Sequence, residues 1–196
     1  KECDDKLRKH IVGTKELTIR GKHNYENICA AIAATKTLVD ISTAIEVIKT
    51  FPGVEHRIEF VGEINGIKVY NDSKSTNVKA TQIALSSFTK PTILLLGGLD
   101  RGHSFEGLTT YMNNVKLVVS YGETKHRIKE YCDKINKECI VVDDLENAVN
   151  IAFKNALEND VILLSPACAS WDQYSDFEER GRKFKEYVTR RMKWVK

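Results

Sequence analysis

The sequence predicts an α/β fold: a Rossmann-like, doubly wound and mainly parallel sheet flanked by helices. Short, continuously apolar segments alternate with helical patterns from residue 92 onward, as is typical of parallel strands covered on both faces. An Ala-rich helical pattern precedes them, and the 196 residues are enough for one full domain and part of a second.

The sequence predicts two helices in the N-terminal quarter of the chain. Residues 23–39 are rich in Ala and carry apolar side chains at helical spacing, and a shorter helix is expected over residues 42–50. Phe51-Pro52-Gly53 then interrupts the chain, because Pro lacks an amide donor and Gly tolerates left-handed angles. The predicted domains are therefore residues 1–52 and 53–196.

Beyond that break, strands are expected at 57–64 and 67–70, joined by Asn65-Gly66, which favours a two-residue hairpin turn. Further strands are expected at 92–96, 117–120, 139–142 and 160–164, and helices at 77–87, 105–112, 124–136, 145–158 and 177–192. Doubly wound sheets bind ligands at the carboxyl ends of their strands. The loops after the strands are thus the places to look for function.

Composition narrows the function classes. The net charge is +3, and the apolar runs are far shorter than the roughly 20 residues of a membrane span. Residues 179–196 hold eight Lys or Arg against two Glu, a pattern that could attract nucleic acid or an anionic membrane. A solvated helix face is favoured, because no aromatic residues interleave as on a nucleic-acid surface. We therefore expect neither nucleic acid nor membrane as a partner.

The five cysteines form no C-x-x-C pair and their number is odd, so neither a disulfide framework nor a zinc site is expected. Cys29 and Cys168 stand among small apolar residues and are expected to be buried free thiols. Cys168 as a nucleophile is a less favoured alternative, since no base is adjacent in the sequence.

Two polar segments precede the strand-rich part or open it. His23-Asn24-x-x-Asn27 opens the first helix and could present several donors and acceptors to one ligand, with plain helix capping as the alternative. His56-Arg57 enters the first strand. Its guanidinium suits phosphate or carboxylate, although a single Arg is usually a surface charge.

The segment from Asn71 to Asn77 follows a strand and is polar throughout. Asp72 could accept from ribose hydroxyls, Lys74 could neutralise phosphate, and Thr76 could bind a carboxylate near the start of a helix. A turn with an N-cap is the alternative. The lysine favours function, because capping does not require it.

Two more loops follow buried strands: Gly97-Gly98-Leu99-Asp100-Arg101-Gly102, and residues 165–173. The glycines allow a close approach to a ligand, but the first loop matches neither the dinucleotide fingerprint nor a P-loop. In the second loop, Trp171 is as compatible with a core position as with a site.

In order, the strings HNYEN, GVEHRIEF, YNDSKSTN, LLLGGLDRG and LLSPACASWDQYSDFEERGRKF resemble the Mur ligase family over essentially the whole chain. The third and the last look specific to its D-glutamate-adding members. The resemblance implies a three-domain, monomeric, ATP-dependent amide ligase of peptidoglycan biosynthesis in the bacterial cytoplasm. ATP would phosphorylate the carboxylate of UDP-N-acetylmuramoyl-L-alanine, and the amine of D-glutamate would attack the acyl phosphate.

The resemblance also implies roles for individual residues. Those matching nucleotide contacts are His23, Asn24, Asn27, Arg57, Asp72 and Lys74. Arg57 and Lys74 would contact the ATP phosphates and act in catalysis, and Asp72 would contact the ribose. Those matching the D-glutamate pocket are Thr76, Arg101, Ser170, Trp171 and Phe177. Arg101 stands where some members have Lys, and Trp171 where Leu is frequent.

Several family features have no counterpart here: the P-loop, the UDP-binding domain, a carbamoylated lysine and the Mg²⁺ ligands. They would lie upstream of Lys1, which is not a Met. Residues 1–52 then resemble the end of the central ATP-binding domain, a helical remnant, and residues 53–196 the C-terminal domain. ATP and Mg²⁺ are the expected cofactors, and this chain alone is expected to be inactive. The alternatives are an unrelated Rossmann-like nucleotide-binding enzyme, which should carry a glycine fingerprint, and a non-catalytic interaction module.

Overall fold

The computed structural model describes residues 10–19 and 21–193, without the side chains of residues 22, 23, 192 and 193. The chain divides into two compact units, with the boundary in the sequence between Gly53 and Val54.

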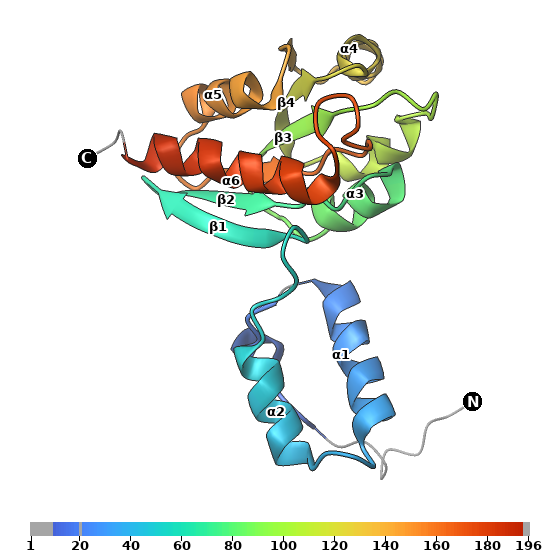
Figure 1. Cartoon of the computed structure of the whole chain (residues 1–196), viewed down its shortest axis with the longest axis vertical. Coiled ribbons are helices and arrows are strands. Elements are labelled where there is room, and N and C mark those ends of the chain that lie inside the picture. The colour runs from blue at the N-terminus through green and yellow to red at the C-terminus, as the bar shows by residue number, and fades with distance from the viewer. Residues whose placement is uncertain (1–9, 20, 194–196) are drawn as a thin grey trace. The chain divides into compact units, whose positions relative to one another are not determined.

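The N-terminal unit contains a 3₁₀ turn, η2 (Thr14–Glu16), and two helices, α1 (Lys22–Thr35) and α2 (Ile41–Thr50) (Figure 1). Asp40 begins α2, because its carboxylate accepts a hydrogen bond from the amide of Thr43 at 2.9 Å. No side chain described between residues 10 and 53 is buried. Cys29 is exposed on α1, so the expectation that it is buried is wrong. Cys3 lies outside the described residues.

The C-terminal unit is built on a six-stranded sheet with the order β1-β2-β6-β3-β4-β5. The strands are β1 (Glu59–Ile64), β2 (Ile67–Asn71), β3 (Thr92–Gly97), β4 (Val115–Tyr121), β5 (Cys139–Val141) and β6 (Val161–Leu164). Only β1 and β2 are antiparallel, and all other pairs are parallel. Asn65 and Gly66 both have positive φ, 49° and 75°, as a type I′ hairpin turn requires. The predicted fold class is confirmed.

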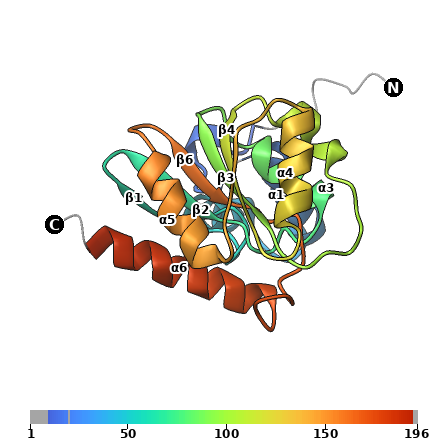
Figure 2. The ribbon, with the colours of Figure 1, turned by 90° about the horizontal axis from the view of Figure 1, so that it is seen from above.

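Helices cover both faces of this sheet (Figure 2). Alternate side chains of β3 point to opposite faces: Leu94 and Leu96 join one apolar cluster, and Ile93 and Leu95 the other. The first cluster includes α3 (Val78–Leu85), the 3₁₀ helix η3 (Glu106–Tyr111) and α4 (Lys125–Lys134). The second includes α5 (Leu145–Asn155) and α6 (Phe177–Lys193).

The segment expected as a helix at residues 105–112 forms a short 3₁₀ helix instead. It contains Gly107, Thr109 and Thr110, all poor residues for an α-helix interior. Its apolar Leu108 is nevertheless fully buried. The segment therefore covers the sheet without extending into regular α-helix.

Strand β6 lies between β2 and β3, so the loops that follow these three strands meet at one edge of the sheet. A Cβ atom at Gly97 would lie 2.0 Å from the carbonyl oxygen of Tyr121, and one at Gly98 2.3 Å from that of Ala169. An isolated antiparallel bridge joins Leu99 to Ala169. Gly98 thus allows the loop after β3 to lie directly against the loop after β6, and Gly97 allows the end of β3 to lie against the end of β4.

Candidate functional site

A buried arginine of α6 joins two of these loops. Arg180 is completely buried. Its guanidinium donates to the carbonyl oxygen of Ser73 at 2.8 Å, to the hydroxyl of Ser73 at 2.9 Å and to the carbonyl oxygen of Cys168 at 3.0 Å. The loop after β2 and the loop after β6 are therefore held to the same side chain.

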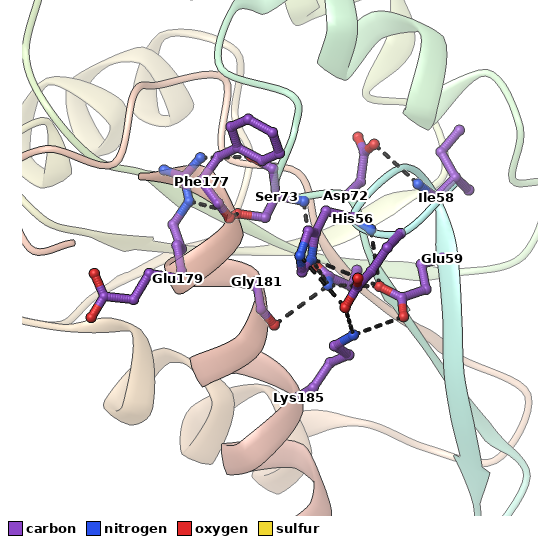
Figure 3. Close-up of polar contacts among 12 residues, drawn as sticks. His56, Ile58, Glu59, Asp72, Ser73, Phe177, Glu179, Gly181 and Lys185 are labelled. Atoms are coloured by element: carbon purple, nitrogen blue, oxygen red, sulfur yellow. Dashed lines mark hydrogen bonds and ion pairs between the residues drawn. The ribbon is translucent and has the colours of Figure 1, made fainter. Parts of the chain in front are cut away.

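A buried histidine lies beside this junction (Figure 3). His56 is 3% exposed, and the Nδ2 of Asn71 lies 2.9 Å from its Nδ1. An amide nitrogen can only donate, so Nδ1 accepts and the neutral ring carries its proton on Nε2. Burial lowers the pKa of His56, although the carboxylates of Glu55 and Glu59 oppose the shift. Lys185 pairs with both carboxylates, at 2.5 Å and 2.9 Å.

The segment that carries Arg57 has an unusual backbone. His56 and Ile58 both have left-handed φ angles, 64° and 47°, which is costly for a β-branched residue such as Ile58. Two hydrogen bonds fix the segment to the loop after β2: the amide of Lys74 donates to His56 at 3.0 Å, and the amide of Ile58 donates to Asp72 at 3.1 Å. Arg57 is thereby held, half-buried, beside that loop.

Asp72 is 1% exposed. Its carboxylate accepts hydrogen bonds from the amide of Ile58, from the hydroxyl of Ser165 at 2.8 Å and from the hydroxyl of Ser75. Burial raises the pKa of Asp72 to about 6, and these hydrogen bonds oppose the rise. Its carboxylate therefore holds the loops after β2 and β6 together, and the ribose contact stays a prediction.

Lys74 and Phe177 come from distant parts of the chain and lie together. The ammonium of Lys74 is 5.6 Å from the centre of the Phe177 ring. Ser73 donates to the Phe177 carbonyl at 2.8 Å, which fixes the start of α6 to this loop. Thr76 follows, half-buried, just before Asn77, which caps α3. Lys74, which is expected to contact the ATP phosphates, and Phe177, which is expected to contact D-glutamate, therefore lie at the same surface.

Arg101 and Trp171 form a second pair at the same edge. The guanidinium carbon of Arg101 lies 4.7 Å from the centre of the Trp171 ring. Trp171 is 62% exposed, so it is not a core residue. Its neighbour Ser170 is buried, and the Ser170 carbonyl accepts from the amides of Gln173 and Tyr174. The proposed substrate contact of Ser170 stays a prediction.

The three nucleotide candidates of the N-terminal unit lie on α1. The helix begins at Lys22 after Gly21, so Asn24 and Asn27 lie inside its first turns. The alternative that they cap the helix is therefore wrong. Asn24 is half-buried and Asn27 is exposed. The side chain of His23 lies outside the described residues.

Arg180 and Cys168 are both buried beside the candidate site. The sequence pattern did not indicate a separate role for Arg180, because this residue is one of many charged residues in a basic segment. It lies four residues before the buried Phe184 and eight before the buried Val188, and that inward spacing is the signal that could have singled it out. Cys168 lies 3.8 Å from Nε2 of His103. Burial raises the pKa of Cys168 to about 11, which argues against its role as a nucleophile.

Comparison with known proteins identifies the class to which this fold and site belong. Residues 56–168 match the family model described as Mur ligase, glutamate ligase domain. The chain belongs to the Mur ligase family. An unrelated Rossmann-like enzyme is thereby excluded.

Two ligases of the same name are similar to this chain over most of its length. The chain is 48% identical over 180 residues to the UDP-N-acetylmuramoylalanine–D-glutamate ligase of Bacillus subtilis. That match covers 91% of this chain and 40% of the Bacillus protein. It is 49% identical over 177 residues to the ligase of the same name from Staphylococcus aureus strain JH9. That match covers 90% of this chain and 39% of the Staphylococcus protein. The chain thus spans about 40% of the length of the curated relatives it matches.

Solved structures show the same fold at low sequence identity. The UDP-N-acetylmuramate-alanine ligase of Thermotoga maritima superposes with a TM-score of 0.68 at 22% identity, over 89% of this chain and 40% of that one. The folylpolyglutamate synthase of the same organism superposes with a TM-score of 0.59 at 18% identity, and the match covers 88% of this chain and 40% of that chain. Among the described residues, no helix is long and apolar enough to cross a membrane.

Proposed function

We propose that this chain is the C-terminal part of an ATP-dependent ligase that adds D-glutamate to UDP-N-acetylmuramoyl-L-alanine in peptidoglycan biosynthesis. The observation that carries the proposal is the edge where the loops after β2, β3 and β6 meet. Lys74 and Arg101 present exposed cations there, and Arg57 a half-buried one. Cations at one edge suit a reaction between a phosphoryl group and two carboxylate-bearing substrates.

The chemistry follows from the weakness of a carboxylate as an electrophile. Transfer of the ATP γ-phosphoryl group to the carboxylate of the L-alanyl residue makes an acyl phosphate with a good leaving group. The amine of D-glutamate then attacks the acyl carbon, the amide bond forms, and inorganic phosphate leaves. Arg57 and Lys74 would stabilise the charge on the transferring phosphoryl group. Thr76, Arg101, Ser170, Trp171 and Phe177 would orient D-glutamate.

Magnesium is the expected partner of ATP, but the described residues offer no good site for it. The group with ligand-like spacing consists of Glu55, His56 and Glu59, whose ligand atoms lie within 4.8 Å of one another. Lys185 already pairs with both carboxylates, so these residues fit an ion-pair cluster better than a cation site. We place the metal ligands in a part of the enzyme outside this chain.

The N-terminal unit fits the end of a larger ATP-binding domain, with the boundary near residue 53. Its exposed apolar side chains include Leu38, Val47 and Phe51, at 81%, 57% and 42%. A protein surface of this kind usually marks an interface. In this proposal His23, Asn24 and Asn27 contact the nucleotide from this unit. The complete enzyme is proposed to be a monomer of the bacterial cytoplasm, acting on small molecules and not on nucleic acid or membrane.

The test uses the complete enzyme that contains this chain. It is incubated with ATP, Mg²⁺, UDP-N-acetylmuramoyl-L-alanine and D-glutamate, and the product is identified by mass. We expect the D-glutamyl adduct and one ADP per adduct, and no adduct with L-glutamate. ADP formation without an adduct would contradict the proposal. The 196-residue chain alone should release no phosphate under the same conditions, because it has no phosphate-binding loop.

Arg101 provides a second test of the proposal. Arg101→Ala in the complete enzyme should raise the KM of D-glutamate much more than the KM of ATP, because the guanidinium is assigned to a substrate carboxylate. Equal changes in both constants would contradict that assignment.

A further inference from the structure

The Arg101–Trp171 pair is held in place by the backbone on both sides. The amide of Leu99 donates to the carbonyl of Ala169 at 3.0 Å, in the bridge that joins the two loops. Arg101 follows this bridge by two residues on one loop, and Trp171 by two residues on the other. Gly98 removes the side chain that would separate the loops. The closeness of the Arg101 guanidinium to the Trp171 ring therefore rests on main-chain contacts as well as on the two long side chains.

The contact with Trp171 leaves the hydrogen-bonding capacity of Arg101 available, because no described residue accepts a hydrogen bond from its guanidinium. Stacking engages the flat face of a guanidinium, whereas its five N–H donors point outward in the plane. A carboxylate can therefore bind the edge of Arg101 in a bidentate manner while the ring of Trp171 stays on its face.

The acid nearest in sequence is directed elsewhere. Asp100 pairs with Arg127 and accepts from the amide of Gly102 at 2.8 Å. No carboxylate among the described residues forms an ion pair with Arg101. Arg127 also donates to the carbonyl of His103 at 2.8 Å, and the donors of buried Arg180 serve Ser73 and Cys168. Of these three arginines, Arg101 is the exposed one whose guanidinium donates to no other described residue.

We propose that Trp171 is a positioning residue: its ring holds the guanidinium of Arg101 ready to receive a carboxylate of an acidic amino-acid substrate. The inference rests on the proposed function and assigns the Trp171 side chain a task of its own. Held on the ring, Arg101 loses less conformational freedom when the substrate binds. The effect therefore belongs to substrate affinity and requires Arg101.

The experiment is a double-mutant cycle in the complete enzyme. The KM values of D-glutamate and ATP and the kcat are measured for wild type, Trp171→Leu, Arg101→Ala and the double variant. A cation–π contact at an exposed site corresponds to about a two- to fivefold change in affinity. We expect Trp171→Leu to raise the KM of D-glutamate by about this factor and to leave the KM of ATP unchanged. In the Arg101→Ala background, it should have no further effect.

A third variant separates positioning from loop structure. Trp171→Phe keeps an aromatic face, so its KM for D-glutamate should lie below that of Trp171→Leu. Thermal melts check that each variant folds. The inference is overturned if Trp171→Leu equals wild type, if it changes both KM values equally, or if it has the same effect without Arg101. If the wild-type enzyme does not join D-glutamate at all, the proposed function fails instead.

Discussion

A Cβ atom on Gly181 would lie 2.2 Å from Nδ1 of His56, so the buried imidazole packs directly on the backbone of α6. The amide of Asn71 also reaches the Gly181 carbonyl at 3.4 Å. The segment before β1, the end of β2 and the start of α6 thus meet at one point. That contact supports the left-handed segment that carries Arg57.

Gly181→Ala should therefore destabilise the protein. Alanine favours a helix by about 1 kcal/mol over glycine, but overpacking in a core costs about 1–3 kcal/mol, and here the added methyl group meets a ring that has no free space. Urea unfolding followed by circular dichroism measures the change. His56→Ala should relieve it, so Gly181→Ala should stabilise the protein in that background. A stabilising effect of Gly181→Ala in the wild-type background would contradict the packing described.

Arg180→Lys should also lower stability. Lysine cannot supply the three planar donors that serve Ser73 and Cys168, and an unsatisfied buried acceptor costs about 1–3 kcal/mol. Arg182→Lys, at an exposed position of the same helix, is the matched control and should change the unfolding free energy by less than about 0.5 kcal/mol. Equal effects of the two variants would show that Arg180 does not join the loops.

Asp72 should give stability an unusual pH dependence. Its pKa is raised to about 6, mainly by burial, so the folded state binds this proton more tightly than the unfolded state does. The contribution is complete below the ordinary pKa of 3.8 and is lost as pH rises through about 6. At about 1.4 kcal/mol per pKa unit, the loss is roughly 3 kcal/mol.

The measurement compares wild type with Asp72→Asn by urea unfolding between pH 4.5 and pH 7. The wild type should lose more stability over this interval than the variant, which has no proton to release at residue 72. Parallel curves for the two proteins would show that the Asp72 carboxyl titrates near its ordinary value.

Cys139 should be more reactive toward alkylation than the two buried cysteines. Its pKa is lowered, chiefly by a hydrogen bond from the thiol of Cys132, and it is half-buried, whereas Cys168 is buried with a pKa raised to about 11. Iodoacetamide at pH 7, followed by peptide mass spectrometry, should label Cys139 several-fold faster than Cys168. Cys132→Ala should slow the labelling of Cys139. Faster labelling in that variant would contradict the hydrogen bond.

The sequence predicted most of the sheet because its strands are short apolar runs bounded by turns. The hairpin at Asn65-Gly66 is an example in which local chemistry alone defines the turn. Local sequence patterns gave wrong predictions at the start of α1 and at residues 105–112. Asn24 looked like a helix cap, but Gly21, with φ of 98°, begins the helix instead. Residues 105–112 have apolar spacing, yet their Gly and Thr residues allow only a 3₁₀ helix.

The candidate site was less predictable, because it depends on contacts between distant segments. Arg101 and Trp171 are both ordinary surface or core residues by type, and no local pattern indicates that one stacks on the other. Arg180 resembles its charged neighbours until its burial is known. The family resemblance supplied the positions of the candidates. Only the fold shows that Asp72 and Arg180 are buried supports of the loops.

The central claim, a ligase that joins D-glutamate through an acyl phosphate, is tested most directly by isotope transfer. UDP-N-acetylmuramoyl-L-alanine labelled with ¹⁸O in its carboxylate is converted by the complete enzyme with ATP and D-glutamate, and the released phosphate is analysed by mass. An acyl phosphate intermediate requires that each released phosphate carries one ¹⁸O from the carboxylate and that its release depends on D-glutamate. Unlabelled phosphate, or release that is indifferent to D-glutamate, would contradict it.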